Sequence, residues 1–280
     1  SDFIIEAGVK PYRYTKLDVD QTVATLNHYC SEAFAMALNP LWRGMSNHTQ
    51  KMFVVDPSTG VRKSNNTRNY YTEFFDHSPY MQGWPKRSQS FICSSGTSYA
   101  RGYGYGGGLY ALFPFNGVKI AVCPERDMWE TPVYIPSMNQ QFTSDCGMGD
   151  FNDWVQNRAK LPIDQWKDMV KRLMKPTWLE NTEFDARTRK VLTSVDGKAP
   201  GEVFLDIVFK ALAPVNTGMR LLTISEYASE RIDNKECWVS GPMVAIRQDV
   251  YEGFKSAITK GAPAGQTSAQ PVNTFAKKAP

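Results

Sequence analysis

Residues 104–108, GYGGG, place four glycines within five positions, and this cluster limits the local fold more than any other stretch of the chain. The segment before it, TSYARGYG, is typical of a short helix, and the segment after it, GLYALFP, is typical of a strand. A P-loop requires Lys-Ser or Lys-Thr before a helix, and a dinucleotide fingerprint on Gly102, Gly104 and Gly107 would also have to open a helix. Glycine accepts positive φ without a steric clash, so the cluster predicts a helix end and a turn into a strand.

Composition narrows the class of protein. The chain has 280 residues, of which 42% are hydrophobic and 12% aromatic, enough for a packed core. Its net charge of +4 comes from 32 basic and 28 acidic residues without a long basic block, which disfavours a strongly basic nucleic-acid-binding surface. We see no apolar run long enough to span a membrane and no signal-like amino terminus, so we expect a cytoplasmic protein that does not enter a membrane.

Cysteine and histidine spacing gives no metal motif. The cysteines are Cys30, Cys93, Cys123, Cys146 and Cys237, and the histidines are His28, His48 and His77. The five cysteines form no Cys-x-x-Cys pair, and their odd number argues against a disulfide framework. We therefore predict reduced thiols and no bound metal.

The pattern along the chain predicts a single domain over residues 1–260 with an insertion. Apolar positions at helical spacing predict a helix over 18–37, with Asp18 or Asp20 as its cap. Strand-like segments follow, and a series of short amphipathic helices predicts a helical insertion at about 131–217 before strand-like segments return. The tail, 261–280, is rich in Ala, Pro, Gly and polar residues, which is typical of a flexible segment.

Three segments stand in a suggestive order: NPLWRGM, SFICSSGTSYARGYG and IDNKECWVSGPMVAIR. They carry an Arg-Gly pair at Arg43, small residues at the end of a strand (Cys93, Ser94 and Ser95), and Glu236 at the start of an apolar strand. In this order the chain resembles ADP-ribosyltransferases of the arginine-serine-glutamate class, found among bacterial toxins and phage proteins that modify their host. The resemblance covers roughly residues 20–125 and 220–250.

The resemblance implies an α+β fold, a split core of two small packed sheets with the helical insertion added. It also implies transfer of ADP-ribose from the substrate NAD to a macromolecule, with release of nicotinamide. A protein acceptor is favoured over nucleic acid, and the cytoplasm of a host or target cell is the expected location.

Each residue of the pattern has a chemical role in that reaction. Breaking the glycosidic bond develops positive charge on the ribose, which the Glu236 carboxylate can stabilise. Ser94 and Ser95 would orient that carboxylate, and Arg43, followed by Gly44, would grip the dinucleotide. Tyr99 or Tyr103 would stack on the nicotinamide.

Two departures from the family pattern affect the site. Cys93 occupies the first hydroxyl position, although a shift by one residue would put a serine there. Asn234 lies two residues before Glu236, where arginine-modifying members carry Glu and some base-modifying members carry Gln. We include Asn234 as a catalytic candidate that can hydrogen-bond an acceptor. The alternative carboxylates are Glu226, Glu230 and Asp233.

Each residue also has a structural reading: a salt-bridged Arg43, a helix cap at Ser94 and Ser95, and a strand-edge carboxylate at Glu236. Two other functions therefore stay open. One is a catalytically degenerate scaffold that acts as a binding or structural protein. The other is NAD hydrolysis, with water as the acceptor.

Overall fold

The fold was analysed in a computed structural model, which describes residues 2–4, 10–46, 48–63, 69–103, 107–130, 153–161, 165–259 and 269–272. The chain divides into two compact units. We call Ser1–Lys63, Trp84–Arg126 and Arg220–Pro280 the sheet unit, and Ser64–Gly83 and Asp127–Met219 the helical unit. Each unit is therefore built from segments that are not continuous in the sequence.

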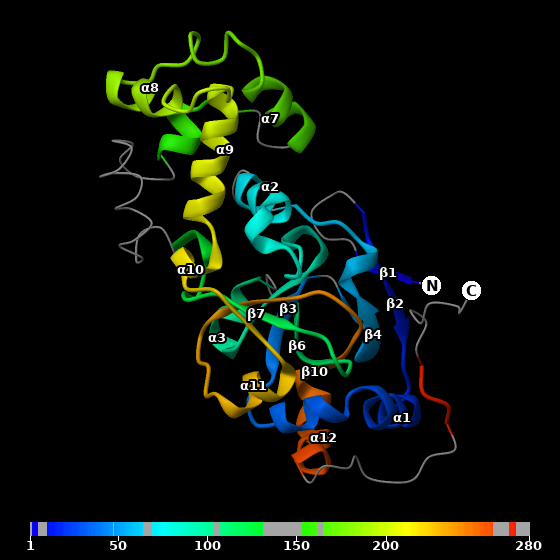
Figure 1. The fold of residues 1–280 in the computed structure, drawn as a ribbon. Helices are drawn as coiled ribbons and strands as arrows, with labels where there is room; N and C mark the ends of the chain where they lie inside the picture. The colour runs from blue at the N-terminus through cyan, green and yellow to red at the C-terminus, as the bar shows by residue number, and fades with distance from the viewer. Residues whose placement is uncertain are drawn as a thin grey trace, which may run out of the picture. The chain divides into compact units, whose positions relative to one another are not determined.

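The sheet unit is built on one antiparallel sheet, and several of its strands are labelled in Figure 1. Its described strands are β1 (Asp2–Ile4), β2 (Tyr12–Lys16), β3 (Leu41–Met45), β4 (Met52–Asp56), β5 (Phe91–Ser94), β6 (Gly108–Pro114), β7 (Ile120–Val122), β8 (Arg220–Leu222), β9 (Glu236–Val239) and β10 (Met243–Arg247). Their order across the sheet is β1-β2-β4-β10-β6-β3-β5-β9-β7-β8. Strands from distant parts of the sequence are thus neighbours.

The sequence predicted two small packed sheets, and the number of sheets was predicted wrongly. Hydrogen-bonded pairing connects all the described strands into one sheet. A single registered pair, Trp42 with Ser94, joins β3 to β5, whereas β3 and β6 share five pairs. Strand propensity predicts where strands occur, but which edges meet depends on contacts between distant segments, so sequence patterns did not reveal this junction.

Helices cover parts of this sheet. In the sheet unit they are α1 (Val19–Tyr29), η1 (Ser31–Met36), η2 (Pro57–Thr59), η4 (Arg87–Gln89), α3 (Thr97–Tyr103), α11 (Ile224–Ser229) and α12 (Gln248–Thr259). Helix α1 packs against β4 and β10, α12 packs against β6 and β10, and α3 packs against β3 and β5.

The predicted cap of the first helix is confirmed at Asp18. Its side chain accepts a hydrogen bond from the Gln21 amide, and the Gln21 side chain accepts one from the Asp18 amide, which together form a capping box. The α-helix ends at Tyr29, earlier than the sequence predicts, and a 3₁₀ helix follows from Ser31. Burial of apolar residues continues through this change, since Ala33 and Met36 of the 3₁₀ helix belong to the core.

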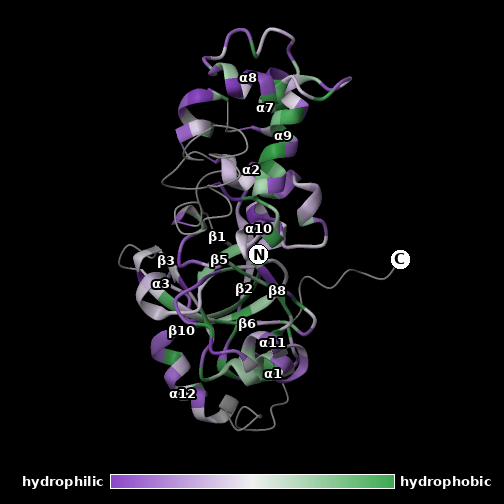
Figure 2. Cartoon of the chain, turned by 60° about the vertical axis from the view of Figure 1, so that its left-hand side comes forward, coloured by the Kyte–Doolittle hydropathy of each residue, from purple (hydrophilic) through white to green (hydrophobic). Residues whose placement is uncertain are grey.

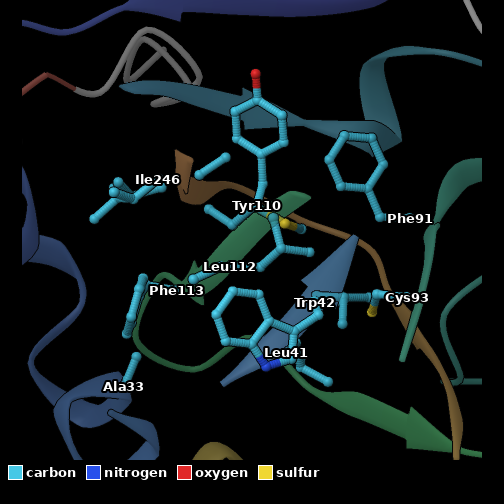
Figure 3. Packing of buried hydrophobic residues seen from close by; sticks show 14 of the residues in the cluster. Ala33, Leu41, Trp42, Phe91, Cys93, Tyr110, Leu112, Phe113 and Ile246 are labelled. Atoms are coloured by element: carbon cyan, nitrogen blue, oxygen red, sulfur yellow. The ribbon is translucent and has the colours of Figure 1, made fainter. Parts of the chain in front are cut away.

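The core of the sheet unit lies around the central strands. Figure 3 shows Trp42, Phe91, Tyr110 and Leu112 among the packed side chains. All four are less than a tenth exposed. Trp42 also makes an edge-on ring contact with Tyr251 of α12, with ring centroids 5.7 Å apart. The central strands, including β3 and β5, are therefore held in a well-packed environment.

His48 joins an aromatic cluster in this core and gives a pH-dependent stability. Its ring lies 4.5 Å from Phe53 and 5.0 Å from Tyr14, centroid to centroid, and burial lowers the pKa of His48. The unfolded chain then binds a proton at a higher pH than the folded protein does. We expect the free energy of unfolding to fall as the pH drops through about 6.5, the ordinary histidine value. Denaturation at several pH values checks this, and His48→Phe should flatten the dependence; an unchanged slope in that variant would contradict it.

Gly107 is required for close approach of β6 to β3. Helix α3 ends at Tyr103 and β6 begins at Gly108, which confirms the predicted change from helix to strand, although 104–106 lie outside the described residues. A Cβ atom at Gly107 would lie 2.1 Å from the Met45 carbonyl oxygen. We expect Gly107→Ala to lower the free energy of unfolding by about 1–3 kcal/mol.

The matched control is Gly102→Ala. Gly102 lies in α3, and a Cβ atom there meets nothing within 4 Å. This variant should instead gain about 0.5–1 kcal/mol, because alanine lowers the entropy lost on folding. Denaturant unfolding of both variants measures the difference, and equal stabilities would show that the β6–β3 approach tolerates a side chain.

The helical unit has its own core. Its described helices are α2 (Tyr70–His77), η3 (Pro79–Met81), η5 (Met128–Glu130), η7 (Trp154–Arg158), α7 (Trp166–Leu173), α8 (Ala186–Leu192), α9 (Pro200–Ala211) and α10 (Pro214–Thr217). Helix α9 is hydrophobic along much of its length (Figure 2), and its Phe204 stacks on Trp154 with ring centroids 4.6 Å apart. Trp178 joins this aromatic pair through an edge-on ring contact with Phe204.

The predicted insertion at about 131–217 falls within this unit. The structure describes helices over 154–217 between β7 and β8, whereas 131–152 and 162–164 lie outside the described residues. The segment Ser64–Gly83, with α2, belongs to the same unit. Of the tail 261–280, only 269–272 is described, and there the Val272 amide donates a hydrogen bond to Thr25 Oγ1 at 3.0 Å. Among the described residues, no helix is long and apolar enough to cross a membrane.

Candidate functional site

The three segments singled out in the sequence lie on neighbouring strands. Strands β3, β5 and β9 are consecutive in the sheet. Ser94 of β5 is paired with Trp42 on one side and with Glu236 on the other, and Arg43 directly follows Trp42. Residues 43, 94 and 236 therefore lie on three neighbouring strands in the middle of the sheet, although they are far apart in the chain.

The two serines organise the backbone at the end of β5. The Ser94 hydroxyl accepts a hydrogen bond from the Gly96 amide at 3.0 Å. The Ser95 amide donates to the Lys235 carbonyl at 3.0 Å, and the Ser95 hydroxyl accepts from the Lys235 amide at 2.8 Å. Ser95 thus fixes the residue immediately before Glu236, while Ser94 stands opposite Glu236 in the strand pair. Both serines are buried.

Glu236 is a buried carboxylate held by hydrogen bonds. Its side chain is 1% exposed, and Oε1 accepts from the Arg87 guanidinium at 2.5 Å and from the Trp238 indole N–H at 2.6 Å. Its backbone is also held, because its amide donates to the Glu125 carbonyl at 3.0 Å. A buried charge is tolerated only when it is paired and hydrogen-bonded, and these contacts meet that condition.

Sequence reasoning missed Arg87 and Trp238. The contact of Trp238 with Glu236 could have been predicted locally, since residues two apart on a strand point to the same side. The contact of Arg87 was harder to predict. Arg87 lies in the short η4 helix just before β5, and only the fold shows that it reaches a carboxylate 149 residues away.

Arg43 is buried beside the same strands. Its guanidinium donates to the Ile92 carbonyl and lies 4.7 Å from the centre of the Phe91 ring. Gly44, the next residue, is buried within β3 and pairs with Leu109. Arg43 therefore supports β5 through a backbone carbonyl and an aromatic face.

The pKa of the Cys93 thiol is affected by burial and by two nearby charges. Burial raises the pKa of its thiol to about 12, the positive charge of Arg43 lowers it, and the negative charge of Glu236 raises it. Arg43 and Glu236 are thus both within electrostatic reach of this thiol. With so high a pKa, and with its Sγ donating to the Cys237 carbonyl at 3.3 Å, Cys93 stays protonated at neutral pH and is no nucleophile.

Asn234 lies two residues before β9, which begins at Glu236. It is exposed, its φ of 48° is in the left-handed region, and its Oδ1 accepts from the Ser98 hydroxyl at 3.5 Å. A Cβ atom at Gly96 would come within 2.0 Å of that oxygen, so glycine permits the contact between α3 and the segment before β9. The amide is accessible to a second molecule.

The predicted aromatic residues lie on α3. Tyr99 is partly exposed, and the Arg126 guanidinium lies 5.8 Å from its ring centre. The side chain of Tyr103 lies outside the described residues.

The alternative carboxylates have structural positions. Glu226 belongs to the capping box of α11, and its backbone-bonded side chain has a lowered pKa. Glu230 pairs with Arg220 at 2.6 Å on the surface. Asp233 is exposed. Glu236 is therefore the carboxylate that shares the central strands with Arg43 and Ser94.

Within the described ranges, no group of three or more His, Cys, Asp or Glu side chains is arranged to hold a metal ion. The described cysteines, Cys30, Cys93, Cys123 and Cys237, are buried, and none of the four is in a disulfide. Comparison of the chain with known family models, with curated proteins and with solved structures gives no match.

Proposed function

We propose that this protein transfers ADP-ribose from NAD to a macromolecular acceptor and releases nicotinamide. The observation that carries the proposal is the adjacency of β3, β5 and β9, with Ser94 directly opposite Glu236. Three motifs that are separately common come together on neighbouring strands. A split ADP-ribosyltransferase-like core, built in this protein on one continuous sheet, is part of the same proposal.

The residues of the site suit a reaction at a ribosyl carbon. The C–N bond to nicotinamide breaks, its electron pair leaves with the nicotinamide, and a nucleophile of the acceptor bonds to the same carbon while its proton passes to solvent. Positive charge on the ribose is stabilised by the carboxylate of Glu236. Ser95 and Trp238 hold that carboxylate and its backbone in place.

Substrate access requires movement at the site. Glu236 is 1% exposed, so the side chains that cover its carboxylate must shift when NAD binds. Arg43, which donates to the Ile92 carbonyl, would likewise have to turn toward a phosphate to grip the dinucleotide. The exposed amide of Asn234 is suited to hydrogen-bond a protein acceptor.

A binding or structural protein is the second candidate. The observation that favours it is the internal pairing of the charges, because a buried Arg87–Glu236 pair and an Arg43–carbonyl contact can serve stability alone. This reading predicts neither NAD binding nor nicotinamide release.

One experiment separates these functions. The purified chain is incubated with NAD labelled in its adenosine part, with and without cell extract, and nicotinamide, free ADP-ribose and labelled macromolecules are measured. Transfer predicts nicotinamide release that increases with extract, and label that protease digestion removes. Free ADP-ribose without extract would instead identify a hydrolase. No release, together with no heat of NAD binding by calorimetry, would exclude both reactions.

A further inference from the structure

Arg87 and Trp238 bind the same carboxylate oxygen. Arg87 Nη1 lies 2.5 Å and Trp238 Nε1 lies 2.6 Å from Glu236 Oε1. The donors come from different elements, since Arg87 begins the η4 helix before β5 and Trp238 lies in β9 itself. Two rigid anchors on one oxygen leave the carboxylate little freedom to rotate.

Trp238 also orients Arg87. The guanidinium carbon of Arg87 lies 4.9 Å from the centre of the Trp238 ring, within the range of a cation–π contact. Trp238 is fully buried, and the Arg87 side chain is only 6% exposed. Each of the three side chains therefore contacts the other two.

Other ionisable groups lie on the strands beside Glu236 and on α11. On β5 and β9 the thiols of Cys93 and Cys237 both have a raised pKa, caused first by burial and further by the negative charge of Glu236. The phenol of Tyr227, on α11, also has a raised pKa because it is buried beside these thiols. These three groups are neutral at neutral pH. Arg43 of β3 adds a positive charge near Cys93, and Arg87 supplies positive charge in direct contact with the carboxylate.

We propose that Arg87 is a positioning residue that keeps the Glu236 carboxylate ionised and, together with Trp238, fixes its orientation through Oε1. Without the guanidinium, a carboxylate this deeply buried would favour its neutral form. Its use in catalysis rests on the proposed ADP-ribosyl transfer, because only the charged form stabilises a positive ribose. The ionisation itself does not depend on that function.

The test uses the Trp238 indole as a reporter of the carboxylate. The full chain is labelled with ¹⁵N-tryptophan, the Trp238 N–H signal is identified by its loss in Trp238→Phe, and its position is followed from about pH 8 to about pH 4. Arg87→Gln keeps an N–H donor and removes the charge, so the midpoint of the signal's titration should rise by about 1–3 pH units. Arg87→Lys keeps the charge, and its midpoint should stay within about half a unit of the wild-type value.

Matched controls make the result specific. Arg220→Met breaks an exposed pair with Glu230 and should leave the Trp238 titration unchanged. In Arg87→Gln combined with Glu236→Gln, the titration should disappear, because the titrating carboxyl is gone. The remaining tryptophan signals show whether each variant is folded; if Arg87→Gln does not fold, the Arg87→Lys titration decides.

A wild-type midpoint in Arg87→Gln, or in Arg87→Lys a rise of more than about one unit, would overturn the proposal. Activity is measured separately, as nicotinamide release against pH. The acidic limb of kcat should move to higher pH in Arg87→Gln and not in Arg87→Lys, with little change in KM. If the indole titration shifts but no variant or wild-type protein releases nicotinamide, the proposed function fails while the role of Arg87 stands.

Discussion

Glu236→Gln is expected to slow nicotinamide release from NAD by about 10²- to 10³-fold while the protein stays folded. The amide has nearly the shape of the carboxylate but no charge to stabilise a positive ribose. Its oxygen can still accept hydrogen bonds from Arg87 and Trp238, the donors that hold Oε1 in the native protein. The substitution should therefore remove most of the transition-state stabilisation while keeping most of the contacts that hold this side chain in the folded protein.

The measurement is single-turnover release of nicotinamide at saturating NAD, with folding checked by near-UV circular dichroism. Glu252→Gln is the matched control, since Glu252 is an exposed carboxylate on α12 of the sheet unit. The control should keep wild-type activity. Equal rates in Glu236→Gln and the wild-type protein would rule out Glu236 as the charge-stabilising group.

Arg87→Met is expected to lower the free energy of unfolding by about 3–5 kcal/mol. The side chains of Arg87 and Glu236 are 6% and 1% exposed, so the substitution removes a positive charge that directly contacts a buried carboxylate. The carboxylate must then remain charged in an apolar environment or take up a proton, and either outcome costs stability. Trp238 also loses the guanidinium that lies over its ring.

A double-mutant cycle isolates this interaction. When Glu236 is already glutamine, Arg87→Met should cost less, because no buried negative charge is left behind. Arg220→Met, which breaks an ion pair of similar length whose side chains are 50% and 41% exposed, should change stability by no more than about 0.5 kcal/mol. Denaturant unfolding provides the free energies of the four proteins of the cycle and of the Arg220→Met control. Additive effects of the Arg87 and Glu236 substitutions would mean that the pair contributes no coupling.

Local sequence signals predicted local structure well. Asp18 begins the first helix because its carboxylate and the Gln21 side chain lie three residues apart, which a capping box requires. Helix α3 ends just before the glycine-rich segment and β6 begins at its last glycine, as the flanking patterns indicated. Each of these features depends on residues within a few positions of one another. The length of the first helix was less well predicted, since apolar spacing alone does not separate α-helix from 3₁₀ helix.

The candidate site was predicted in part. The order of the motifs led to Arg43, Ser94 and Glu236, and the fold does bring their strands together. The burial of Glu236 and its contact with Arg87 were not predicted, and neither was the single pair that joins β3 to β5. Such contacts leave no pattern of spacing, because they connect segments whose separation in the chain is arbitrary.

The sequence by itself determined where many of the helices and strands lie and which residue types are available for chemistry, because propensity, capping and periodicity act over short distances. Only the tertiary structure decided which strands are neighbours, and therefore that Glu236 is covered and paired. The physical reason is that the charge state and orientation of a buried carboxylate depend on the groups around it in space. For Glu236 those groups include Arg87, 149 residues away, and the indole of Trp238.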